Sequence, residues 1–366
     1  QGENHVLAIT VDGKLFAWGD NTYQQLGFSS PSQQNSPLQI EYFKNIKVVQ
    51  ADGGLQHSVI LTENNQVYTC GSNRYGQLVR DGSNSPQLVS PKFFKNETVI
   101  QVAAQDQITY IMTDKSVYVF GNCKNGQCAT HHNNKMDLLE IPTKIWAGEE
   151  SVFIQTAKGL FAAGANTHGQ LCFPPNLNDQ GNYQAQLVKL VLNPIHVSAG
   201  HYHTLFLLEG KVMGCGLNSA FQMSSNGGEF HEPTLISEDK NIRAVAACSD
   251  GSIFLKAEEI LVIGSQLTGE LGIGNKTNVE QMYNIDLKAQ DVDQLLCRSD
   301  FAIIHSIDHK IPQSPVNIGL IVGVSVGGAI LLVIICVLMY VVGRPWKDKK
   351  KYKHIKNVGR VSNDQS

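Results

Sequence analysis

Charged side chains are scarce in this sequence, and basic ones are the scarcer kind over most of its length. Asp, Glu, Lys and Arg together make up 17% of the 366 residues, which is low for a soluble enzyme. The part before residue 318 holds 21 basic and 30 acidic side chains, a balance of −9. Such an acidic body matches phosphate backbones poorly, so we expect no nucleic-acid partner.

Catalytic signatures are missing as well. No glycine-rich phosphate loop stands between a strand and a helix, and no nucleophile elbow is visible. Acidic residues such as Glu149, Glu150, Asp291 and Asp293 are isolated in expected loops, where solvation is their ordinary role. The sequence therefore predicts no catalytic residue, no cofactor and no enzymatic activity.

A helical period of 3.6 residues is not sustained anywhere before residue 308. Runs of four to six residues rich in Val, Ile, Tyr and Phe take its place, for example at 46–51 and 57–62. The turns between them include Asp12-Gly13 and Asn64-Asn65, which tolerate the positive φ of tight hairpins. This pattern predicts an all-β fold with about four short strands to a unit.

One turn sequence recurs along the chain. Gly-Ser-Asn-Arg-Tyr-Gly-Gln-Leu stands at 71–78, and five related stretches have first glycines that are 43 to 52 residues apart. A period of this size is typical of closed or stacked repeat folds. The recurring positions are Gly19, Asn21, Gly71, Asn73, Gly76, Leu78, Gly121, Gly126, Gly164, Asn166, Gly169, Leu171, Gly216, Asn218, Gly264 and Gly269.

We expect these positions to be structural. Gly71 can adopt backbone angles closed to other residues, the Asn73 side chain can bond nearby backbone groups, and Leu78 returns to the core. Histidines also recur at one repeat position, which indicates a structural role for them too. They are His5, His57 and His203.

The strand at 57–62, its hairpin and the turn at 71–78 resemble the repeat of the regulator of chromosome condensation family. The resemblance covers about residues 2–307 and implies a seven-bladed β-propeller, which we place at 1–308. The family's name-giving member is a nuclear exchange factor for the small GTPase Ran and docks on nucleosomes.

Six repeats are clear and a seventh is partial. The seventh has expected strands at 292–297 and 301–306, but no third strand and no glycine turn follow. The chain also opens inside a repeat at Gln1, so residues upstream of Gln1 are the candidate source of the closing strands. Without them the ring would leave unpaired strand edges.

A long uncharged segment follows the repeats. Residues 318–343 carry no charge, and roughly 20 such residues suffice to cross a bilayer. Eight basic residues follow from Arg344 onward. The positive-inside rule therefore predicts a single transmembrane helix, a cytosolic basic tail at 344–366 and a propeller outside the cell or in a lumen. A linker at 309–317 would join them, and this topology needs a signal peptide upstream.

Two shorter signals lie in this C-terminal part. Gly319, Gly323 and Gly327 are four residues apart and would form a helix-packing face for a homodimer, although glycine is common in membrane helices. Tyr352 and Ile355 have the spacing of a tyrosine-based sorting motif, a four-residue pattern that also arises by chance.

The cysteines leave several interpretations open. Cys123 and Cys128, followed by His131 and His132, could form a metal site or a local disulfide, or Cys128 could pack in the leucine position of its repeat. We favour packing over metal. Seven cysteines precede the apolar segment, so at least one is free or pairs elsewhere. The other five are Cys70, Cys172, Cys215, Cys248 and Cys297.

Asn96 and Asn275 are glycosylation acceptors in expected loops, in agreement with a luminal propeller. The leading hypothesis is a non-enzymatic, membrane-anchored propeller that presents a protein- or ligand-binding face on the extracellular or luminal side. The alternative is a cytosolic propeller that regulates a small GTPase. A propeller-based enzyme is a weaker alternative.

Overall fold

A computed structural model of the chain describes residues 2–82, 84–94, 97–132, 134–175, 183–265, 271–273, 278–285, 292–298, 301–306 and 320–325. They all belong to one compact unit, Gln1–Cys336. Their secondary structure is strand apart from two short 3-10 helices, Glu41–Phe43 and Pro91–Phe94. The predicted all-β class is confirmed for this part of the chain.

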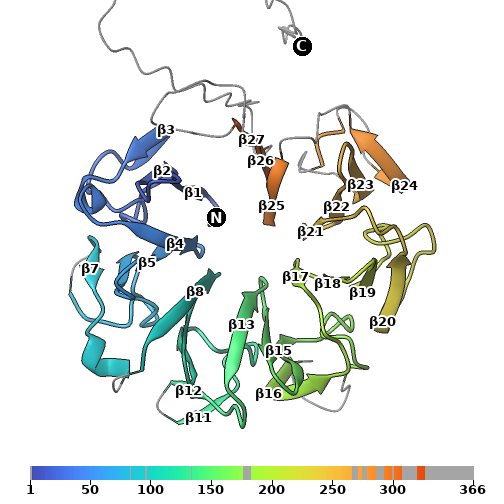
Figure 1. Cartoon of the computed structure of the whole chain (residues 1–366), viewed down its shortest axis with the longest axis horizontal. Coiled ribbons are helices and arrows are strands. Elements are labelled where there is room, and N and C mark those ends of the chain that lie inside the picture. The colour runs from blue at the N-terminus through green and yellow to red at the C-terminus, as the bar shows by residue number, and fades with distance from the viewer. Residues whose placement is uncertain are drawn as a thin grey trace, which may run out of the picture. The chain divides into compact units, whose positions relative to one another are not determined.

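Seven antiparallel sheets stand around a common centre, and we number them as blades 1 to 7 in chain order (Figure 1). Blade 1 contains β1 (His5–Ile9), β2 (Leu15–Asp20) and β3 (Gln33–Gln39). Blade 2 contains β4 (Val48–Gly53), β5 (His57–Thr62), β6 (Val67–Gly71) and β7 (Gln87–Leu88). Blade 3 contains β8 (Val99–Gln105), β9 (Ile108–Thr113), β10 (Val117–Gly121), β11 (Thr130–His132) and β12 (Lys135–Met136).

The next three blades have four strands each. Blade 4 contains β13 (Pro142–Ala147), β14 (Ser151–Thr156), β15 (Gly159–Ala165) and β16 (Tyr183–Leu190). Blade 5 contains β17 (His196–Ala199), β18 (His203–Leu208), β19 (Lys211–Leu217) and β20 (Glu229–Ser237). Blade 6 contains β21 (Ala244–Ala247), β22 (Gly251–Leu255), β23 (Ile260–Ser265) and β24 (Asn278–Ile285). Blade 7 contains β25 (Val292–Arg298), β26 (Phe301–Ser306) and β27 (Leu320–Ser325).

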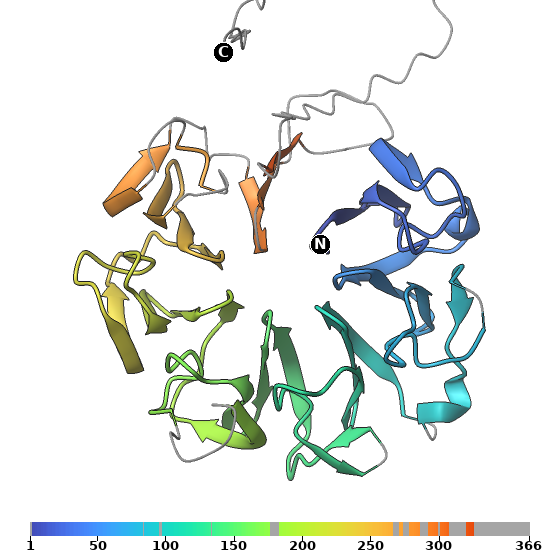
Figure 2. The ribbon, with the colours of Figure 1, turned by 180° about the vertical axis from the view of Figure 1, so that it is seen from behind.

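The first strands of blades 2 to 7 lie toward the centre of the ring, and the last strands of blades 1 to 6 lie at its outside, as the reverse view also shows (Figure 2). Hydrophobic cores form between neighbouring blades. The core between blades 2 and 3, for example, joins Val59 and Val67 with Val102 and Ile111, all at most 2% exposed. Such cores join each pair of consecutive blades from blade 1 to blade 7, so blades 2 to 6 bury both faces against their neighbours.

Each blade has two chemically different ends. At the motif end, the first strand passes to the second through a short loop, at 54–56 in blade 2, and the third strand runs into the glycine turn at 71–78. At the hairpin end, the second strand turns back into the third, at 63–66. Linkers between blades also lie at the hairpin end, because each first strand begins there.

Blade 7 departs from the predicted organisation. Leu320–Ser325 form β27 and pair with β26, whereas the sequence predicts a membrane helix from residue 318. Gly323, expected on a helix face, lies in this strand opposite Ile303. The physical reason is that β26 has no glycine-ended third strand of its own, and the apolar, partly β-branched run of β27 satisfies its open backbone edge.

The remaining C-terminal predictions fall outside the described residues. These are Gly319 and Gly327, the segment 326–343, the basic tail, and Tyr352 with Ile355. Within the described residues, no helix has the length and apolar character needed to span a bilayer.

Candidate functional site

The first glycine of each turn is required by its backbone geometry. Gly71 has a φ of +105°, and a Cβ placed on it would lie 2.4 Å from the carbonyl oxygen of Gln56 in the preceding loop. The first glycines of all six turns have φ between +103° and +121°. They are Gly19, Gly71, Gly121, Gly164, Gly216 and Gly264.

The asparagine of the turn closes it from inside. Asn73 Nδ2 donates to the carbonyl oxygen of Arg80 at 2.8 Å, and Asn73 Oδ1 accepts from the Leu78 N–H at 2.9 Å. The amide thus ties both sides of the turn to one side chain. Equivalent bonds are made by Asn21, Asn166 and Asn218.

The second glycine is less constrained than the first. Gly76 has a φ of +81°, yet a Cβ there would meet nothing within 4 Å. Gln24 and Phe221 occupy this position in blades 1 and 5 with φ of 65° and 61°. Gly126 and Gly169 also have positive φ, while Gly269 lies outside the described residues. Leu78 and Leu171 are fully buried, as predicted for core anchors.

The recurring histidines join neighbouring blades through a relay. His5 Nε2 lies 2.8 Å from Ser58 Oγ of the next blade, and this hydroxyl donates to the carbonyl oxygen of Gln25 at 2.7 Å. The hydroxyl has one proton, so His5 must be the donor in the first bond. His57 repeats the arrangement with Thr109, at 2.8 Å.

His203 lies 2.9 Å from Ser252 Oγ and is completely buried. Burial lowers the pKa of His203 to about 3, so the ring is neutral at physiological pH. The prediction that these histidines are structural agrees with their positions.

Two glutamines make a further contact between blades that the sequence interpretation missed. Gln50 donates from Nε2 to the carbonyl oxygen of Val102 at 2.8 Å and accepts the Val102 N–H at 3.0 Å. Gln101 makes the same pair of bonds to Ile145, at 2.7 and 3.0 Å. Each side-chain amide therefore bonds the backbone N–H and C=O of one residue in the next blade, as a paired strand would. The signal was the glutamine at the same place in two consecutive first strands.

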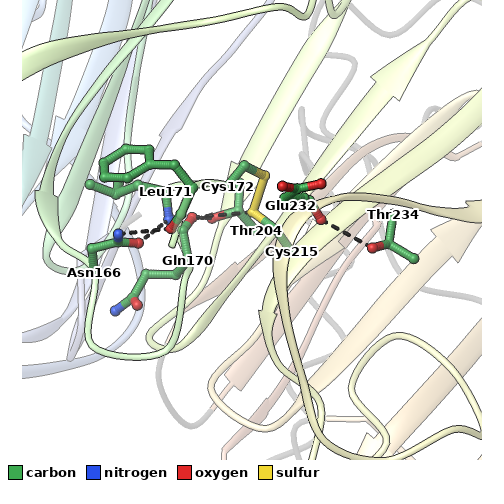
Figure 3. Close-up of a disulfide and its surroundings, with 9 residues drawn as sticks. Asn166, Gln170, Leu171, Cys172, Thr204, Cys215, Glu232 and Thr234 are labelled. Atoms are coloured by element: carbon green, nitrogen blue, oxygen red, sulfur yellow. Dashed lines mark hydrogen bonds between the residues drawn. A yellow bond between two sulfur atoms is a disulfide. The ribbon is translucent and has the colours of Figure 1, made fainter. Parts of the chain in front are cut away.

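Two buried disulfides also cross between blades. Cys172, which follows the turn of blade 4, is bonded to Cys215 in β19 of blade 5 (Figure 3). Beside it, the Thr204 hydroxyl donates to the carbonyl oxygen of Gln170 at 2.7 Å (Figure 3). A second disulfide joins blades 6 and 7, between Cys248 and Cys297. The two cysteines are 43 residues apart in the first disulfide and 49 in the second, close to the length of one repeat. This spacing was the signal in the sequence for pairing between neighbouring blades.

The remaining cysteines resolve the predicted alternatives. Cys123 and Cys128 form the local disulfide within the turn of blade 3, and Cys128 is 3% exposed in the leucine position. Among the described residues, no group of His, Cys, Asp and Glu is arranged to hold a metal ion. Cys70 is the free thiol in this part of the chain, and burial raises its pKa to about 12.

The motif end of blades 4 and 5 carries a connected polar and aromatic surface. His168 Nδ1 lies 2.6 Å from Glu229 Oε1, and His231 Nε2 lies 3.0 Å from Glu229 Oε2. Hydrogen bonds with these two imidazoles hold the pKa of Glu229 below its usual value. All three side chains are between 28% and 39% exposed, so a partner can reach them.

Aromatic rings continue this surface toward the centre of the ring. The rings of His201 and Tyr202 stack at 4.0 Å, and His168 meets Tyr202 edge-on at 5.2 Å. His201 Nδ1 lies 3.1 Å from Glu149 Oε2. We call this set the blade 4–5 patch. It comprises Glu149, His168, His201, Tyr202, Glu229 and His231.

Carboxylates extend beyond the patch along the motif end. Asn125 donates to Glu150 Oε1 at 2.8 Å. Burial raises the pKa of Asp106, a hydrogen bond from the Gln107 N–H opposes this, and the charge of Glu150 adds to the rise. The surface therefore combines carboxylates with partly exposed aromatic rings, a chemistry suited to cationic side chains of a partner.

Comparisons with known proteins agree with this geometry. A sequence profile of the regulator of chromosome condensation (RCC1) repeat matches residues 12–61, and a second profile of that repeat matches residues 48–77. The human regulator of chromosome condensation is 27% identical over 329 residues, covering 80% of this chain and 78% of the relative. The crystal structure of Prp20p from Saccharomyces cerevisiae has a TM-score of 0.73 at 21% identity, covering 86% and 82% of the two chains.

Residues 12–77 carry RCC1 repeats, and the described blades have the fold of an RCC1-type β-propeller. Another similar protein is the probable E3 ubiquitin-protein ligase HERC3 from Homo sapiens, at 31% identity over 149 residues. That match covers 40% of this chain and only 14% of the ligase. The RCC1-repeat propeller thus spans a small part of such relatives, whose activities belong to much longer proteins.

The predicted sites of this RCC1-repeat propeller can now be located. The turn positions, apart from Gly269, build six blades and their joins, and they form no single cluster. Asn96 and Asn275 lie outside the described residues. The blade 4–5 patch was not predicted, because its members come from three separate loops and one outer strand.

Proposed function

We propose that this RCC1-repeat propeller is a non-enzymatic, membrane-anchored protein that displays its motif end on the extracellular or luminal side. The observation that carries the proposal is the pair of buried disulfides between blades, Cys172–Cys215 and Cys248–Cys297. Structural disulfides persist in oxidising compartments, whereas cytosolic thiols are kept reduced. A propeller whose blades are joined in this way fits the secretory pathway.

The sequence supports the same side of the membrane. The uncharged segment 318–343 is followed by a basic tail, which favours a cytosolic C-terminus. The body is acidic, and Asn96 and Asn275 offer acceptors for luminal glycosylation. These features favour a receptor-like or scaffold protein over a cytosolic regulator.

The blade 4–5 patch is the proposed binding face. Its ring faces and carboxylates are presented by neighbouring blades that are held together by a disulfide. A preorganised surface loses little conformational entropy on binding, so it suits recognition of a protein partner that offers Lys or Arg side chains.

Location is tested with the full chain, tagged at its C-terminus and expressed in a cell with a secretory pathway. In sealed microsomes we expect added protease to remove the tag and leave the propeller intact. We also expect an endoglycosidase to shift the mass of the wild type and not that of an Asn96→Gln, Asn275→Gln variant. A propeller digested from outside, with no glycan and with free thiols at Cys172 and Cys215, would contradict the proposal.

That contrary result would favour the cytosolic alternative. Prp20p has binding properties toward Gsp1p and histones, and the shared fold makes a cytosolic regulator the competing candidate.

The binding face is tested by a photo-crosslinking residue at Tyr202, with Leu235 on the outer strand β20 as the matched site. Leu235 is 48% exposed and lies outside the patch. We expect a discrete adduct on the cell surface from position 202 and none from position 235. Equal labelling at the two sites would remove the patch as the binding face.

A further inference from the structure

The most exposed aliphatic side chains gather at one end of the ring. In the described part of the chain, the aliphatic side chains that are more than half exposed lie at the hairpin end. They are Val11 (83%), Val49 (51%), Leu139 (99%), Ile141 (62%), Val191 (100%) and Ile195 (58%). Solitary apolar residues are common on surfaces, but their restriction to one end needs an explanation.

Their placement follows from the strand order. Val11 stands in the hairpin of blade 1, between β1 and β2. Leu139 and Ile141 lie in the linker that leads into β13, and Val191 follows β16 directly. Ile195 precedes β17 and donates its N–H to the Leu207 carbonyl oxygen at 2.8 Å. Turns and linkers of this kind are ordinarily polar, so these residues are not required by the fold.

The two ends also differ in charge. At the hairpin end, lysines lie next to carboxylates, so much of the charge there is neutralised. The pairs include Lys14–Asp12, Lys44–Glu41, Lys47–Glu63, Lys158–Glu140 and Lys256–Glu259. The motif end instead carries the carboxylates of the blade 4–5 patch, Glu150 and Asp106.

The apolar segment begins at the hairpin end and then runs along β26 to Ser325, which pairs with Phe301 at the motif end. Phe301 of β26 takes the register position of His57, so Ser306 ends this second strand at the hairpin end. Leu320 pairs with Ser306 and lies at the same end. The 11 residues at 307–317 can span at most roughly 40 Å, which limits how far the start of the apolar segment can move from Ser306.

We propose that the hairpin end rests on the bilayer surface, with its exposed aliphatic side chains in the headgroup region and the motif end turned away. The occupant of this face is the phospholipid surface on the propeller's own side of the membrane. This inference rests on the proposed membrane anchoring. It requires Leu320–Ser325 to leave β26 when the apolar segment enters the bilayer.

The arrangement explains why apolar and paired basic side chains coexist at this end. Aliphatic groups enter the interfacial layer, while lysines extend their chains along it and keep their ammonium groups near phosphates. The blade 4–5 patch is then presented to solvent, where a partner on a facing surface can reach it.

The experiment uses the full chain in phosphatidylcholine vesicles, with Trp346→Phe removing the tryptophan beside the predicted span. One tryptophan at a time is added to the buried native Trp18 and Trp146, as Leu139→Trp or Val191→Trp. Leu139 and Val191 are so exposed that the change leaves the core intact. Tyr75→Trp, on the motif end and 41% exposed, is the matched control. Peptide mapping of Cys172–Cys215 checks that each variant is folded.

We expect brominated phosphatidylcholine to reduce the added emission of Leu139→Trp and Val191→Trp, and to leave that of Tyr75→Trp unchanged. If the emission at positions 139 and 191 is not reduced in a chain that resists alkaline extraction, the orientation proposed here is wrong and the membrane anchoring stands. Quenching at 75 in place of 139 and 191 would also overturn that orientation, because the motif end would then face the lipid. A chain that alkaline extraction releases would contradict the anchoring itself.

Discussion

At the scale of single residues, the two glycines of the turn do different work. Gly71 is constrained by φ and by the nearby Gln56 carbonyl, whereas Gly76 has open space around it. We expect Gly71→Ala to lower the free energy of unfolding by about 3 kcal/mol or more, and Gly76→Ala by about 1–2 kcal/mol. Chemical denaturation of the two variants measures the difference. Equal losses would show that the close approach at Gly71 is relieved by a small backbone shift.

The buried His203 gives a pH dependence at the same scale. Its pKa is lowered from the usual 6.5 to about 3, so below pH 6.5 the unfolded chain takes up a proton that the folded chain excludes. Stability from this group is present above pH 6.5 and is lost as pH falls toward 3. We expect His203→Gln to be less stable than the wild type at pH 7, yet to lose less stability between pH 6.5 and pH 4.5.

Ser252→Ala is the matched control for that experiment. It removes the hydrogen-bond partner of His203 but keeps the buried imidazole, so it should lower the melting temperature at pH 7 and retain the wild-type slope with pH. A His203→Gln slope equal to that of the wild type would assign the acid sensitivity to other groups.

Much of this residue chemistry could be predicted from the repeat alone. A glycine that ends each third strand and an asparagine two positions later have strong local meaning, and their bonds lie within eight residues. The His5–Ser58–Gln25 relay could not be predicted, because its members come from two blades and three separate strands and turns. Only the superposition of consecutive blades brings such side chains together.

At the scale of elements, the joins between blades are interchangeable. Cys70 and Cys215 have the same register, and their Sγ atoms both lie 3.5 Å from a glutamine carbonyl oxygen of the preceding blade. Gly27 occupies the position of Cys172, with φ of +83° against 63°. The join between blades 1 and 2 therefore lacks only the Cβ and Sγ atoms of a second cysteine, at position 27.

We expect Gly27→Cys to form a disulfide with Cys70 and to stabilise the protein by about 2–4 kcal/mol. A Cβ at Gly27 would lie 3.1 Å from Ile40 and 3.2 Å from Pro86, so these side chains must yield slightly. Peptide mapping detects the bond and thermal unfolding measures its effect. Gly27→Ser is the control for the lost glycine. Two persistent free thiols in Gly27→Cys would show that the blade joins are not equivalent.

The elements themselves were largely predictable, and the exceptions have one cause. Strands, hairpins and turns depend on residues close together in the sequence, so the repeat pattern predicted their positions. Contacts between blades depend instead on which blades are neighbours. They include the disulfides of Cys172 and Cys248 and the bonds from Gln50 and Gln101 to the next blade. A separation near one repeat period is the sequence signal that connects them, and it becomes specific only once a ring is assumed.

At the scale of the whole molecule, blade 7 shows where a local pattern is ambiguous. An apolar run of Leu, Ile, Val and Gly suits both a membrane helix and a strand at an open edge. The structure pairs Leu320–Ser325 with β26, while hydropathy places the same residues in the bilayer. The proposed membrane anchor therefore requires Leu320–Ser325 to leave β26.

The anchoring role of the apolar segment is tested by placing charge at its centre. The double variant Val333→Arg, Ile334→Arg should lose about 5–7 kcal/mol of insertion free energy, because each arginine costs about 2.5–3.5 kcal/mol at the middle of a span. We expect alkaline extraction to release this variant from membranes and to leave the wild type in place. Leu139→Arg, which adds a charge to a propeller side chain that is 99% exposed, should remain anchored. If the double variant stays in the membrane as firmly as the wild type, residues 318–343 are not the anchor.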